Sequence, residues 1–365
     1  MVFLFIQPIN QLMTLYSILT ANISIYKRNW TGATAPAKGA TAPAKGATAP
    51  AKGATATANR GKTLPTPHYL GIFPVYRIYC SPMKRKYNLG IIGHPLGHTL
   101  SPVMHRATAE SLGMEVSYDP FDVTPEDLPK FMAGLGHGGL DGLNVTVPHK
   151  LAVMESMDEI SEEAENIGAV NTIVVSDGRL SGHNTDAYGF ITSITDNAKI
   201  DPSNQRTLVL GAGGAARAVV WAMIKAGARV TIANRTEQKA AKIADDFSAA
   251  GAPVDVMEFG SQLLASVAKD SRIIINATSV GMKGGGEGAL PDLGPSLHED
   301  QLVVDIVYRP LDTPLLQMAR QAGAATLDGL WMLIHQGAGS FKLWTGQTPS
   351  PAVARAALEK ALRQG

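Results

Sequence analysis

Alternating apolar and polar residues predict a short strand in the segment GLNVTVPHK, residues 142–150. The apolar positions alternate with Asn144 and Thr146, and Pro148 ends the run, because proline is poorly tolerated inside a sheet. We expect three apolar side chains to face a core, namely Leu143, Val145 and Val147. Asn144 and Thr146 then share the opposite face, since strand residues two apart point the same way. Lys150 follows directly.

A lysine after a strand is usually a solvated loop charge, and this alternative applies to Lys150. Two further segments favour a functional role for Lys150. GAVNT (168–172) and GHNTDAYG (182–189) again place polar residues beside glycines at the ends of apolar runs. Their Asn171 and Asp186 give Lys150 candidate neighbours. Asp186 is the natural charge partner of Lys150.

From Thr207 the chain reads TLVLGAGGAARAVVWAMIKAGARVTIANRT, which predicts a strand, a glycine turn, a helix and a second strand. The turn carries the GxGxxA form of the dinucleotide fingerprint at Gly211, Gly213 and Ala216. The glycines permit a tight turn and close approach to a pyrophosphate, while the alanine allows helix-to-strand packing. Gly214 and Ala215 open the helix, whose first amides would face the phosphates. The alternative is a glycine turn that binds nothing.

The end of the second strand predicts NADP rather than NAD. An NAD site places Asp or Glu there to hold the ribose 2′-hydroxyl, whereas this chain has Asn234, Arg235 and Thr236. Arg235 can stack on adenine and pair with a 2′-phosphate, and Lys239 adds positive charge one turn later. A solvated loop arginine is the plain alternative.

A further buried strand is predicted in IIINATSVGM, residues 273–282. It ends in polar residues where an open α/β sheet binds its ligand, which makes Thr278 a candidate cofactor contact. Asn276, Thr278 and Ser279 are alternatively residues that only cap the loop.

Composition narrows the function classes. The chain has 365 residues, 17% of them charged, and a net charge of +1, which argues against nucleic-acid and acidic-membrane partners and leaves room for two domains. Its only cysteine, Cys80, excludes an internal disulfide and a CxxC metal site, so we expect a cytoplasmic protein. The histidines near the motifs show no HxH or HExxH spacing, and we assign no metal.

Residues 1–85 differ from the rest. The uncharged stretch 1–26 is interrupted by polar residues and proline, and no basic segment precedes it, so a membrane anchor or signal is disfavoured. GATAPAK then occurs three times in succession within 32–52, a composition that predicts disorder. A second hypothesis makes Met83 the true start of the protein. Intact-mass spectrometry of natively expressed protein would contradict it by finding a chain that begins at Met1.

From about Tyr87 to the C-terminus the motifs resemble those of the shikimate dehydrogenase family. The matching blocks occur in the family's order: GHPLGHTLSPVMH (93–105), NVTVPHK (144–150), GAVNT with GHNTDA, GAGGAARA with NRT, and DGLWMLIHQGAGSFKLWTG (328–346). The resemblance implies an α/β fold with an N-terminal α/β substrate domain (86–187), a Rossmann-type doubly wound NADP domain (188–327), and C-terminal helices (328–365) that return to the substrate domain. It also implies NADP-dependent interconversion of shikimate and 3-dehydroshikimate, on the route to aromatic amino acids.

The resemblance further implies roles for single residues. Thr99 and Ser101 match positions that bind the substrate carboxylate, and Lys150 and Asp186 match the catalytic pair. The remaining implied substrate contacts are Thr146, Asn171, Tyr308 and Gln336. Gly329 is expected to let the last helices approach the cofactor. A buried tyrosine and a solvated glutamine are the plain alternatives for Tyr308 and Gln336.

The chemistry agrees with these roles. A hydride that leaves NADPH for a ketone builds negative charge on oxygen, so a cation that can donate a proton is required. Lys150 can do both, Asp186 would orient it, and neutral groups at 144, 146 and 171 would bind a polyol ring.

Two departures from the family pattern bear on specificity. Thr99 replaces a usual serine, and Arg106 replaces a usual asparagine. The methyl group that Thr99 adds narrows the substrate pocket, so shikimate and quinate remain alternative substrates. A quinate or broader-specificity dehydrogenase is therefore one rival, and a module that senses NADP or a metabolite without turnover is another. The sequence allows a monomer or a homodimer.

Overall fold

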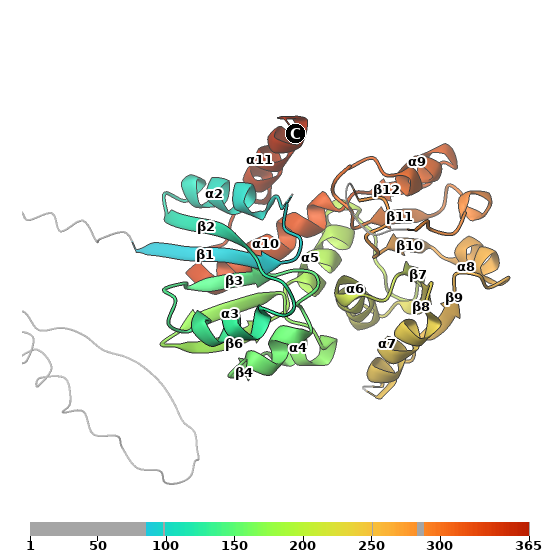
Figure 1. Ribbon diagram of the computed structural model, residues 1–365. Helices are drawn as coiled ribbons and strands as arrows, with labels where there is room; N and C mark the ends of the chain where they lie inside the picture. The colour runs from blue at the N-terminus through green and yellow to red at the C-terminus, as the bar shows by residue number, and fades with distance from the viewer. Residues whose placement is uncertain (1–84, 98, 250, 283–287, 365) are drawn as a thin grey trace, which may run out of the picture. The chain divides into compact units, whose positions relative to one another are not determined.

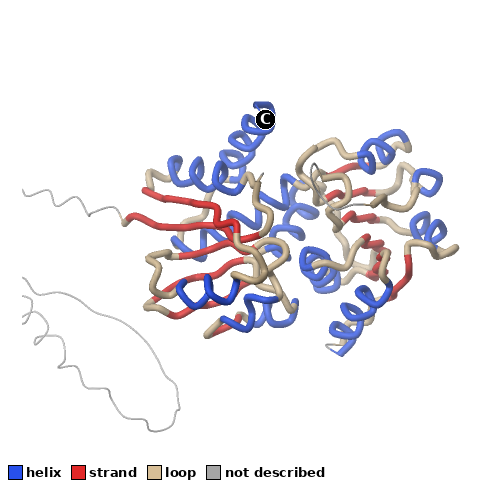
Figure 2. The backbone as a smooth tube through the Cα atoms, in the orientation of Figure 1, coloured by secondary structure: helices blue, strands red, loops and turns tan. Residues whose placement is uncertain are grey.

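The computed structural model describes residues 85–364 apart from 98, 250 and 283–287 (Figure 1). The GATAPAK repeats, the predicted disorder around them and the Met83 hypothesis lie outside the described residues. Two six-stranded sheets organise the described chain, and Figure 2 shows their strands against the helices that pack on them. The expected α/β class is confirmed.

The first sheet is mixed and has the strand order β2-β1-β3-β5-β6-β4. Its strands are β1 (Lys86–Gly93), β2 (Glu115–Asp122), β3 (Gly142–Val145), β4 (Glu159–Ile160), β5 (Thr172–Ser176) and β6 (Arg179–His183). β1 pairs in parallel with β2 and β3, whereas β5 runs antiparallel to both β3 and β6. The segments that carry GLNV, GAVNT and GHNT are thus neighbouring strands of one sheet.

Helices cover both faces of this sheet. The associated elements are α2 (Ser101–Ser111), α3 (Leu128–Leu135), a 3₁₀ turn (Ala152–Ser156), α4 (Glu162–Ile167), α10 (Leu330–Thr345) and α11 (Pro351–Gln364). On one face Leu143 and Val145 pack with α3 and the 3₁₀ turn, and on the other Leu89 and Tyr118 pack with Trp344 of α10. Burial on both faces explains why β3 has no exposed position.

The second sheet has the order β12-β11-β10-β7-β8-β9, and each of its strand pairs is parallel. Its strands are β7 (Arg206–Leu210), β8 (Arg229–Asn234), β9 (Asp255–Glu258), β10 (Ile273–Asn276), β11 (Leu302–Asp305) and β12 (Ala325–Leu327). Its helices are α6 (Gly214–Lys225), α7 (Glu237–Ala249), α8 (Leu264–Asp270) and α9 (Pro314–Gln321). α6 and α7 pack on one face, and α8 and α9 on the other. This is the doubly wound Rossmann order, and the strand order reverses between β7 and β10, where such sheets bind ligand.

The C-terminal helices return to the first sheet, as expected. Leu100 and Met104 at the start of α2 pack with Leu330 of α10 and Leu358 of α11. α10 also lies against α5 (Asp186–Thr192), which continues into a π-helical turn (Ser193–Asn197), and α5 in turn packs on α6 (Figure 1). A Cβ on Gly189 of α5 would lie 2.5 Å from the backbone nitrogen of Gln336, so the two helices meet at backbone contact.

One part of the predicted strand is wrong. β3 ends at Val145, and Val147 is 63% exposed instead of facing the core. The reason lies in the backbone, because the Thr146 amide still donates to Ile92 but the Thr146 carbonyl accepts from the His149 amide. That bond closes a turn, so the strand ends three residues before the proline.

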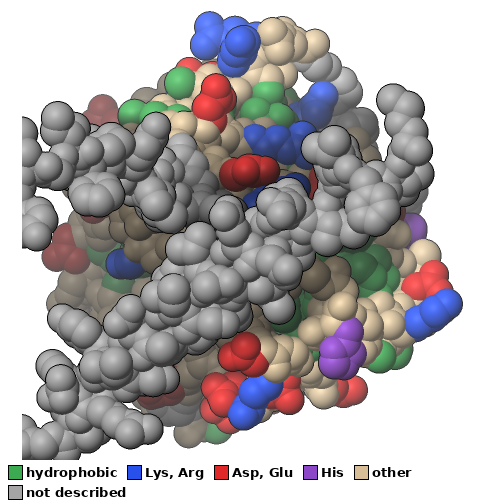
Figure 3. Space-filling model, turned by 90° about the vertical axis from the view of Figure 1, so that its left-hand side faces the viewer, with side chains coloured by type: hydrophobic (Ala, Val, Ile, Leu, Met, Phe, Trp, Pro, Cys, Tyr) green, Lys and Arg blue, Asp and Glu red, His purple; other side chains and the backbone are tan. Residues whose placement is uncertain are grey.

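Charged side chains of both signs are interspersed on the face that Figure 3 shows, where the described surface is visible. This agrees with the near-neutral net charge. Within the described residues, no helix combines the length and apolarity needed to cross a bilayer.

Candidate active site

Lys150 lies in the turn after β3, and hydrogen bonds to two other segments hold this turn in place. The neighbouring His149 is buried, and its Nε2 lies 2.6 Å from the Val123 carbonyl. The Lys150 carbonyl accepts from the Val170 amide at 2.8 Å. The backbone of Lys150 is therefore fixed to the segment that leads into β5, which leaves only its side chain to adjust.

Lys150 and Asp186 form a buried ion pair. The Lys150 Nζ lies 2.5 Å from Asp186 Oδ2, and the two side chains are 11% and 7% exposed. The solvated loop charge is thus the wrong description of this lysine. A carboxylate at hydrogen-bond distance holds the ammonium in one place, and low solvent access strengthens that attraction.

Asn171 holds the other carboxylate oxygen. Its Nδ2 donates to Asp186 Oδ1 at 2.8 Å and to Thr185 Oγ1 at 3.0 Å. Its Oδ1 accepts from the Thr185 amide at 2.7 Å. Asn184 adds a second support, because its Oδ1 accepts from the Asp186 amide while its Nδ2 donates to the Ala169 carbonyl. Both oxygens of Asp186 are directed by neighbours that the backbone fixes.

A continuous chain of hydrogen bonds runs behind this pair, and we call it the buried polar network. Its members are Lys150, Asp186, Asn171, Thr185, Thr172, Ser340, Asn144 and Tyr118. Ser340 of α10 lies at its centre. Its Oγ is 2.9 Å from Asn144 Nδ2, 2.8 Å from Thr172 Oγ1 and 3.1 Å from Thr185 Oγ1. The network connects Tyr118 of β2 with the predicted catalytic pair.

Asn144 is an internal brace in this network. Its Oδ1 accepts from the Tyr118 hydroxyl at 2.7 Å, and its Nδ2 also donates to the Asn171 carbonyl and Thr172. Both polar atoms of Asn144 are thus engaged by protein, which contradicts the expectation that its amide reads a polyol ring. Burial raises the pKa of Tyr118 well above its usual value, although a hydrogen bond with Ser101 opposes the shift.

The remaining predicted substrate contacts lie on other segments of the chain. Thr146 is half-buried, and a Cβ on Gly93 would lie 2.4 Å from its methyl group, so the GHPLG loop packs directly on it. Thr99 Oγ1 accepts from the Ser101 amide at 3.3 Å. Tyr308 packs with Leu100, and burial raises its pKa although Arg309 opposes the shift.

Gln336 is half-buried on α10 and faces the pair. Its Oε1 lies 3.4 Å from Asn171 Nδ2, and its Nε2 donates to the Leu333 carbonyl. A solvated glutamine is therefore the wrong description. α10 thus supplies Gln336 to the site and Ser340 to its support, one helical turn apart.

The dinucleotide turn, residues 211–214, follows β7 and opens α6. Gly211 has φ +114°, and a Cβ there would lie 2.8 Å from the Thr278 methyl, so only glycine fits. Gly213 is exposed, and a Cβ there would meet nothing within 4 Å. That free space before the N-terminus of α6 fits the close approach of a phosphate. A Cβ on Gly214 would lie 3.5 Å from Lys150 Cβ and Cδ, which places this lysine beside the turn.

The predicted 2′-phosphate residues gather at the end of β8 and the start of α7. Asn234 Nδ2 donates to the Thr236 carbonyl at 2.8 Å, and the Lys239 amide donates to the same carbonyl. Arg235, Thr236 and Lys239 are exposed. Exposed cations on a short ordered turn suit recognition of an anion that arrives from solvent.

Two predicted cofactor residues have structural explanations of their own. The Thr278 hydroxyl donates to Asn276 Oδ1 at 2.7 Å and accepts from the Val280 amide, so it caps its loop, as the alternative held. At Gly329 a Cβ would lie 2.2 Å from the Ile306 carbonyl oxygen. This glycine lets α10 begin against protein backbone. Direct cofactor contact by either residue stays a prediction.

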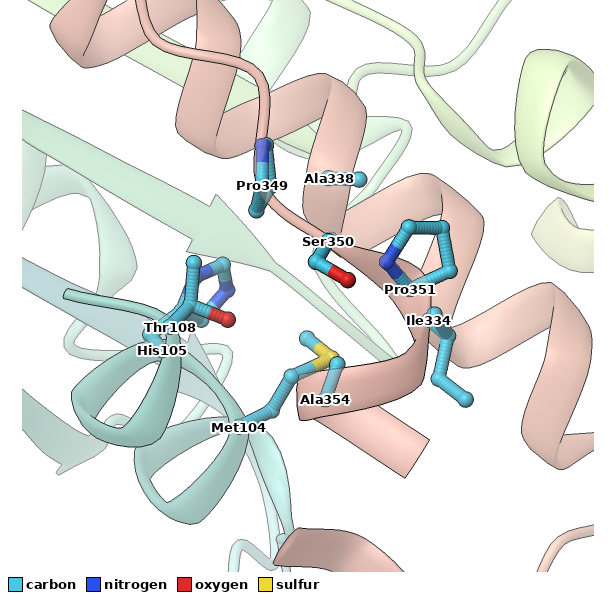
Figure 4. A pocket seen from close by; sticks show the side chains of 10 residues that line it. Met104, His105, Thr108, Ile334, Ala338, Pro349, Ser350, Pro351 and Ala354 are labelled. Atoms are coloured by element: carbon cyan, nitrogen blue, oxygen red, sulfur yellow. The ribbon is translucent and has the colours of Figure 1, made fainter. Parts of the chain in front are cut away.

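A pocket lies between α2, α10 and α11, and no predicted site residue lines it (Figure 4). His105 borders it, with its ring stacked 4.5 Å from that of Tyr118. Burial lowers the pKa of His105 to about 3. Within the described residues, no group of three or more His, Cys, Asp or Glu is arranged to hold a metal ion.

Family models match three consecutive parts of the chain. The shikimate dehydrogenase substrate binding domain matches residues 91–173, the shikimate / quinate 5-dehydrogenase model matches 194–321, and the shikimate 5′-dehydrogenase C-terminal domain matches 329–359. Shikimate dehydrogenase (NADP(+)) of Symbiobacterium thermophilum is 44% identical over 278 residues, which cover 75% of this chain and 94% of that relative.

The chain belongs to the shikimate dehydrogenase family.

Solved structures of the family resemble the whole described part. Shikimate 5-dehydrogenase from Thermus thermophilus, in complex with NADP(H) and shikimate, is 39% identical with a TM-score of 0.67, over 75% of this chain and 99% of that one. Quinate dehydrogenase from Corynebacterium glutamicum, in complex with NAD, is 31% identical with a TM-score of 0.69, over 76% of this chain and 100% of that one. Relatives named for both of the substrates that the sequence left as alternatives therefore share this fold.

The supporting residues of the site escaped sequence analysis. Ser340, Tyr118, Thr172 and Thr185 were not singled out by the residue patterns. A weak signal existed for three of them, since Thr172 and Thr185 sit inside the GAVNT and GHNTDA blocks and Ser340 sits inside the block 328–346. Tyr118 becomes visible only when distant segments are brought together.

Proposed function

We propose that this chain catalyses the NADP-dependent, reversible reduction of 3-dehydroshikimate to shikimate, a step on the route to aromatic amino acids. The observation that carries the proposal is the buried Lys150–Asp186 pair, 2.5 Å apart, beside a glycine turn of dinucleotide type. Relatives that are 44% and 40% identical are named shikimate dehydrogenase (NADP(+)), which agrees with it.

Lys150 is the proton donor in this proposal. When bound, NADPH supplies a hydride to the ketone carbon, and NADP⁺ accepts one in the reverse direction. Charge that builds on the ketone oxygen is stabilised by the Lys150 ammonium, which then transfers a proton to that oxygen. In the reverse direction the neutral amine removes the hydroxyl proton.

Asp186 orients Lys150 and accepts a hydrogen bond from a ring hydroxyl. Asn171 fixes Asp186 through its other oxygen, at 2.8 Å. Preorganisation of this kind lowers the barrier because no reorientation is required during the reaction. Ser101, Thr99, Thr146 and Gln336 complete the substrate contacts in the proposal, and Tyr308 lies beside them.

The residues present fit NADP. Gly211 makes the tight turn, Gly213 leaves room for a pyrophosphate, and α6 offers its first amides there. Gly214 and Ala215 belong to the same helix start. No acidic residue stands at the end of β8, where Asn234, Arg235, Thr236 and Lys239 would hold a 2′-phosphate. NADP is therefore favoured over NAD.

Quinate is the second candidate substrate. Thr99 stands where the family usually has serine, and a relative of the same fold is named quinate dehydrogenase. That relative is in complex with NAD, whereas the β8 end of this chain lacks the acidic residue that NAD requires. Shikimate is accordingly the first choice. We also propose a cytoplasmic location and a monomer or homodimer.

The test is a spectrophotometric panel of shikimate and quinate, each with NADP⁺ and NAD⁺. We expect the fastest turnover with shikimate and NADP⁺. Lys150→Ala should lower kcat by about 10²–10⁴, with little change in NADP⁺ affinity, because general acid-base catalysis contributes that much. Lys130→Ala, an exposed lysine on α3, is the matched control. Equal rates for Lys150→Ala and the unsubstituted chain would refute the proposal.

A further inference from the structure

Arg217 is a buried arginine that the proposed mechanism does not use. It lies on the first turn of α6, and its amide donates to the Gly213 carbonyl of the dinucleotide turn at 3.0 Å. Its side chain is only 9% exposed. A guanidinium is costly to bury unless each side of it is paired, so its partners indicate what it does.

Those partners lie on two different parts of the fold. Arg217 Nη1 is 2.7 Å from Asp246 Oδ2 of α7, and the guanidinium lies over the Phe247 ring at 5.4 Å. Its Nε donates to the Ile167 carbonyl at 2.5 Å, at the end of α4. Asp246 and Phe247 belong to α7, which packs on the second sheet, whereas Ile167 belongs to α4, which is associated with the first sheet.

The glycine of the GAVNT block is explained by the same side chain. Gly168 has φ +69°, and a Cβ there would lie 2.7 Å from Arg217 Nη2. Glycine is thus required twice, once for the left-handed backbone and once to admit the guanidinium. The guanidinium therefore packs against the backbone itself.

The segment that Arg217 holds is the backbone support of the catalytic pair. Ala169 accepts from Asn184, whose side-chain oxygen receives the Asp186 amide. Val170 donates to the Lys150 carbonyl, and Asn171 bonds Asp186 directly. Residues 167–171 therefore connect Arg217 with both members of the pair along one short stretch of chain.

We propose that Arg217 is a positioning residue that couples occupancy of the dinucleotide turn to the segment 167–171, and through it to the Lys150–Asp186 pair. This inference rests on the proposed function for the identity of the cofactor and of the pair. A phosphate at the start of α6 stabilises the first turn of that helix, which includes Arg217. Through its contacts with Ile167 and Gly168, Arg217 then restricts the motion of the segment 167–171. Lysine cannot replace it, because one ammonium lacks the planar fork that bonds a carbonyl and a carboxylate at once.

The test is amide hydrogen exchange with NADP⁺ alone, followed in peptides that cover residues 164–171. In the unsubstituted chain we expect NADP⁺ to slow exchange there by about threefold or more, because the opening of the segment becomes coupled to the turn. Arg217→Lys should lose that slowing while NADP⁺ still slows exchange at residues 211–216. Arg206→Lys, which alters an exposed ion pair with Asp270 in the same sheet, should behave as the unsubstituted chain.

Several outcomes would overturn the proposal. Equal slowing at 164–171 in Arg217→Lys and the unsubstituted chain is one, and no slowing in the unsubstituted chain is another. Should Arg217→Lys fail to fold, Asp246→Asn replaces it, since it weakens the hold on the guanidinium from the α7 side alone. Slowing in that variant below half of the unsubstituted value supports the coupling, and full slowing refutes it.

Kinetics separate positioning from mere stability. We expect kcat with shikimate to fall by about tenfold in Arg217→Lys, with KM for NADP⁺ changed by less than about threefold, as loss of alignment predicts. A fall in melting temperature with unchanged kcat would mean a structural role only and would overturn the proposal. Absence of shikimate turnover in the unsubstituted chain would refute the proposed function, whereas the exchange experiment needs no turnover.

Discussion

The two halves of the site are built in opposite ways. The buried polar network around Lys150 and Asp186 has its polar atoms bonded to neighbours before any ligand arrives. The turns predicted to hold NADP instead present an exposed Gly213 and the exposed side chains of Arg235 and Lys239. The substrate side is thus ordered by hydrogen bonds within the protein, whereas the cofactor side offers exposed positive charge. Substitutions should therefore cost turnover and stability on the first side, and cofactor affinity on the second.

Among substitutions that keep Lys150, the largest effect should come from Asp186→Asn. The amide keeps the shape but removes the charge that holds the Lys150 ammonium, so we expect kcat to fall by about 10²–10³, within the range of positioned acid-base groups. KM for NADP⁺ should stay within about twofold, since the cofactor turn is untouched. Steady-state kinetics measure both. Asp270→Asn, at an exposed ion pair, serves as the control, and an unchanged kcat in Asp186→Asn would break the comparison.

Arg235→Ala tests the other side. Loss of a charge-assisted hydrogen bond to a 2′-phosphate should raise KM for NADP⁺ by about 10–100-fold and leave that for NAD⁺ nearly unchanged. The melting temperature should not move, because the side chain is exposed. Arg229→Ala, exposed at the start of the same strand, is the matched control. Equal losses with both cofactors would show that Arg235 does not select the phosphate.

Ser340→Ala sharpens the claim that the substrate side is preorganised. It leaves Asn144, Thr172 and Thr185 without a shared partner, which should lower the free energy of unfolding by about 1–3 kcal/mol. KM for shikimate should rise by about threefold to tenfold as Asn171 and Gln336 lose alignment. Urea unfolding and initial rates provide the measurements. Ser193→Ala removes another buried helical hydroxyl, which donates to the Phe190 carbonyl, and should lower stability without a change in KM.

The last test concerns pH. His105 has a folded pKa of about 3, below its usual value near 6.5, so the unfolded chain binds the extra proton between these values. Stability from this group is complete above about pH 6.5 and is lost as pH falls toward 3, by about 1.4 kcal/mol per unit. His105→Phe keeps a ring against Tyr118. It should reduce the pH dependence of the free energy of unfolding by the contribution of one proton, about 1.4 kcal/mol per pH unit. The exposed His137→Phe is the control, and identical slopes in His105→Phe and the unsubstituted chain would contradict the assignment.

Much of the fold and of the site was predictable because local chemistry and tertiary structure agree there. The βαβ unit, the helix start beside Ala215 and the meeting of Lys150 with Asp186 follow from strand ends and glycine turns. Val147 was wrongly assigned because a single backbone bond from His149 ends the alternation early.

What could not be predicted depends on long-range contacts. Ser340 and Arg217 act through partners that are remote in sequence, and no periodicity points to them. The sequence gives no sign that Gly329 also lies against Ile306, where a Cβ would meet the carbonyl oxygen. The residue pattern of a segment predicts the secondary structure of that segment. Which distant segment packs against it depends on the tertiary fold.

The bond between Asn144 and Ser340 joins residues 196 positions apart, and Trp344 donates to the Ile173 carbonyl across 171 positions. All strands of the second sheet, 206–327, are made between these partners. A ribosome therefore releases that sheet in full before α10 can dock on the first one. The half of the molecule that is translated first is thus completed last, by a helix that is translated after the whole second sheet.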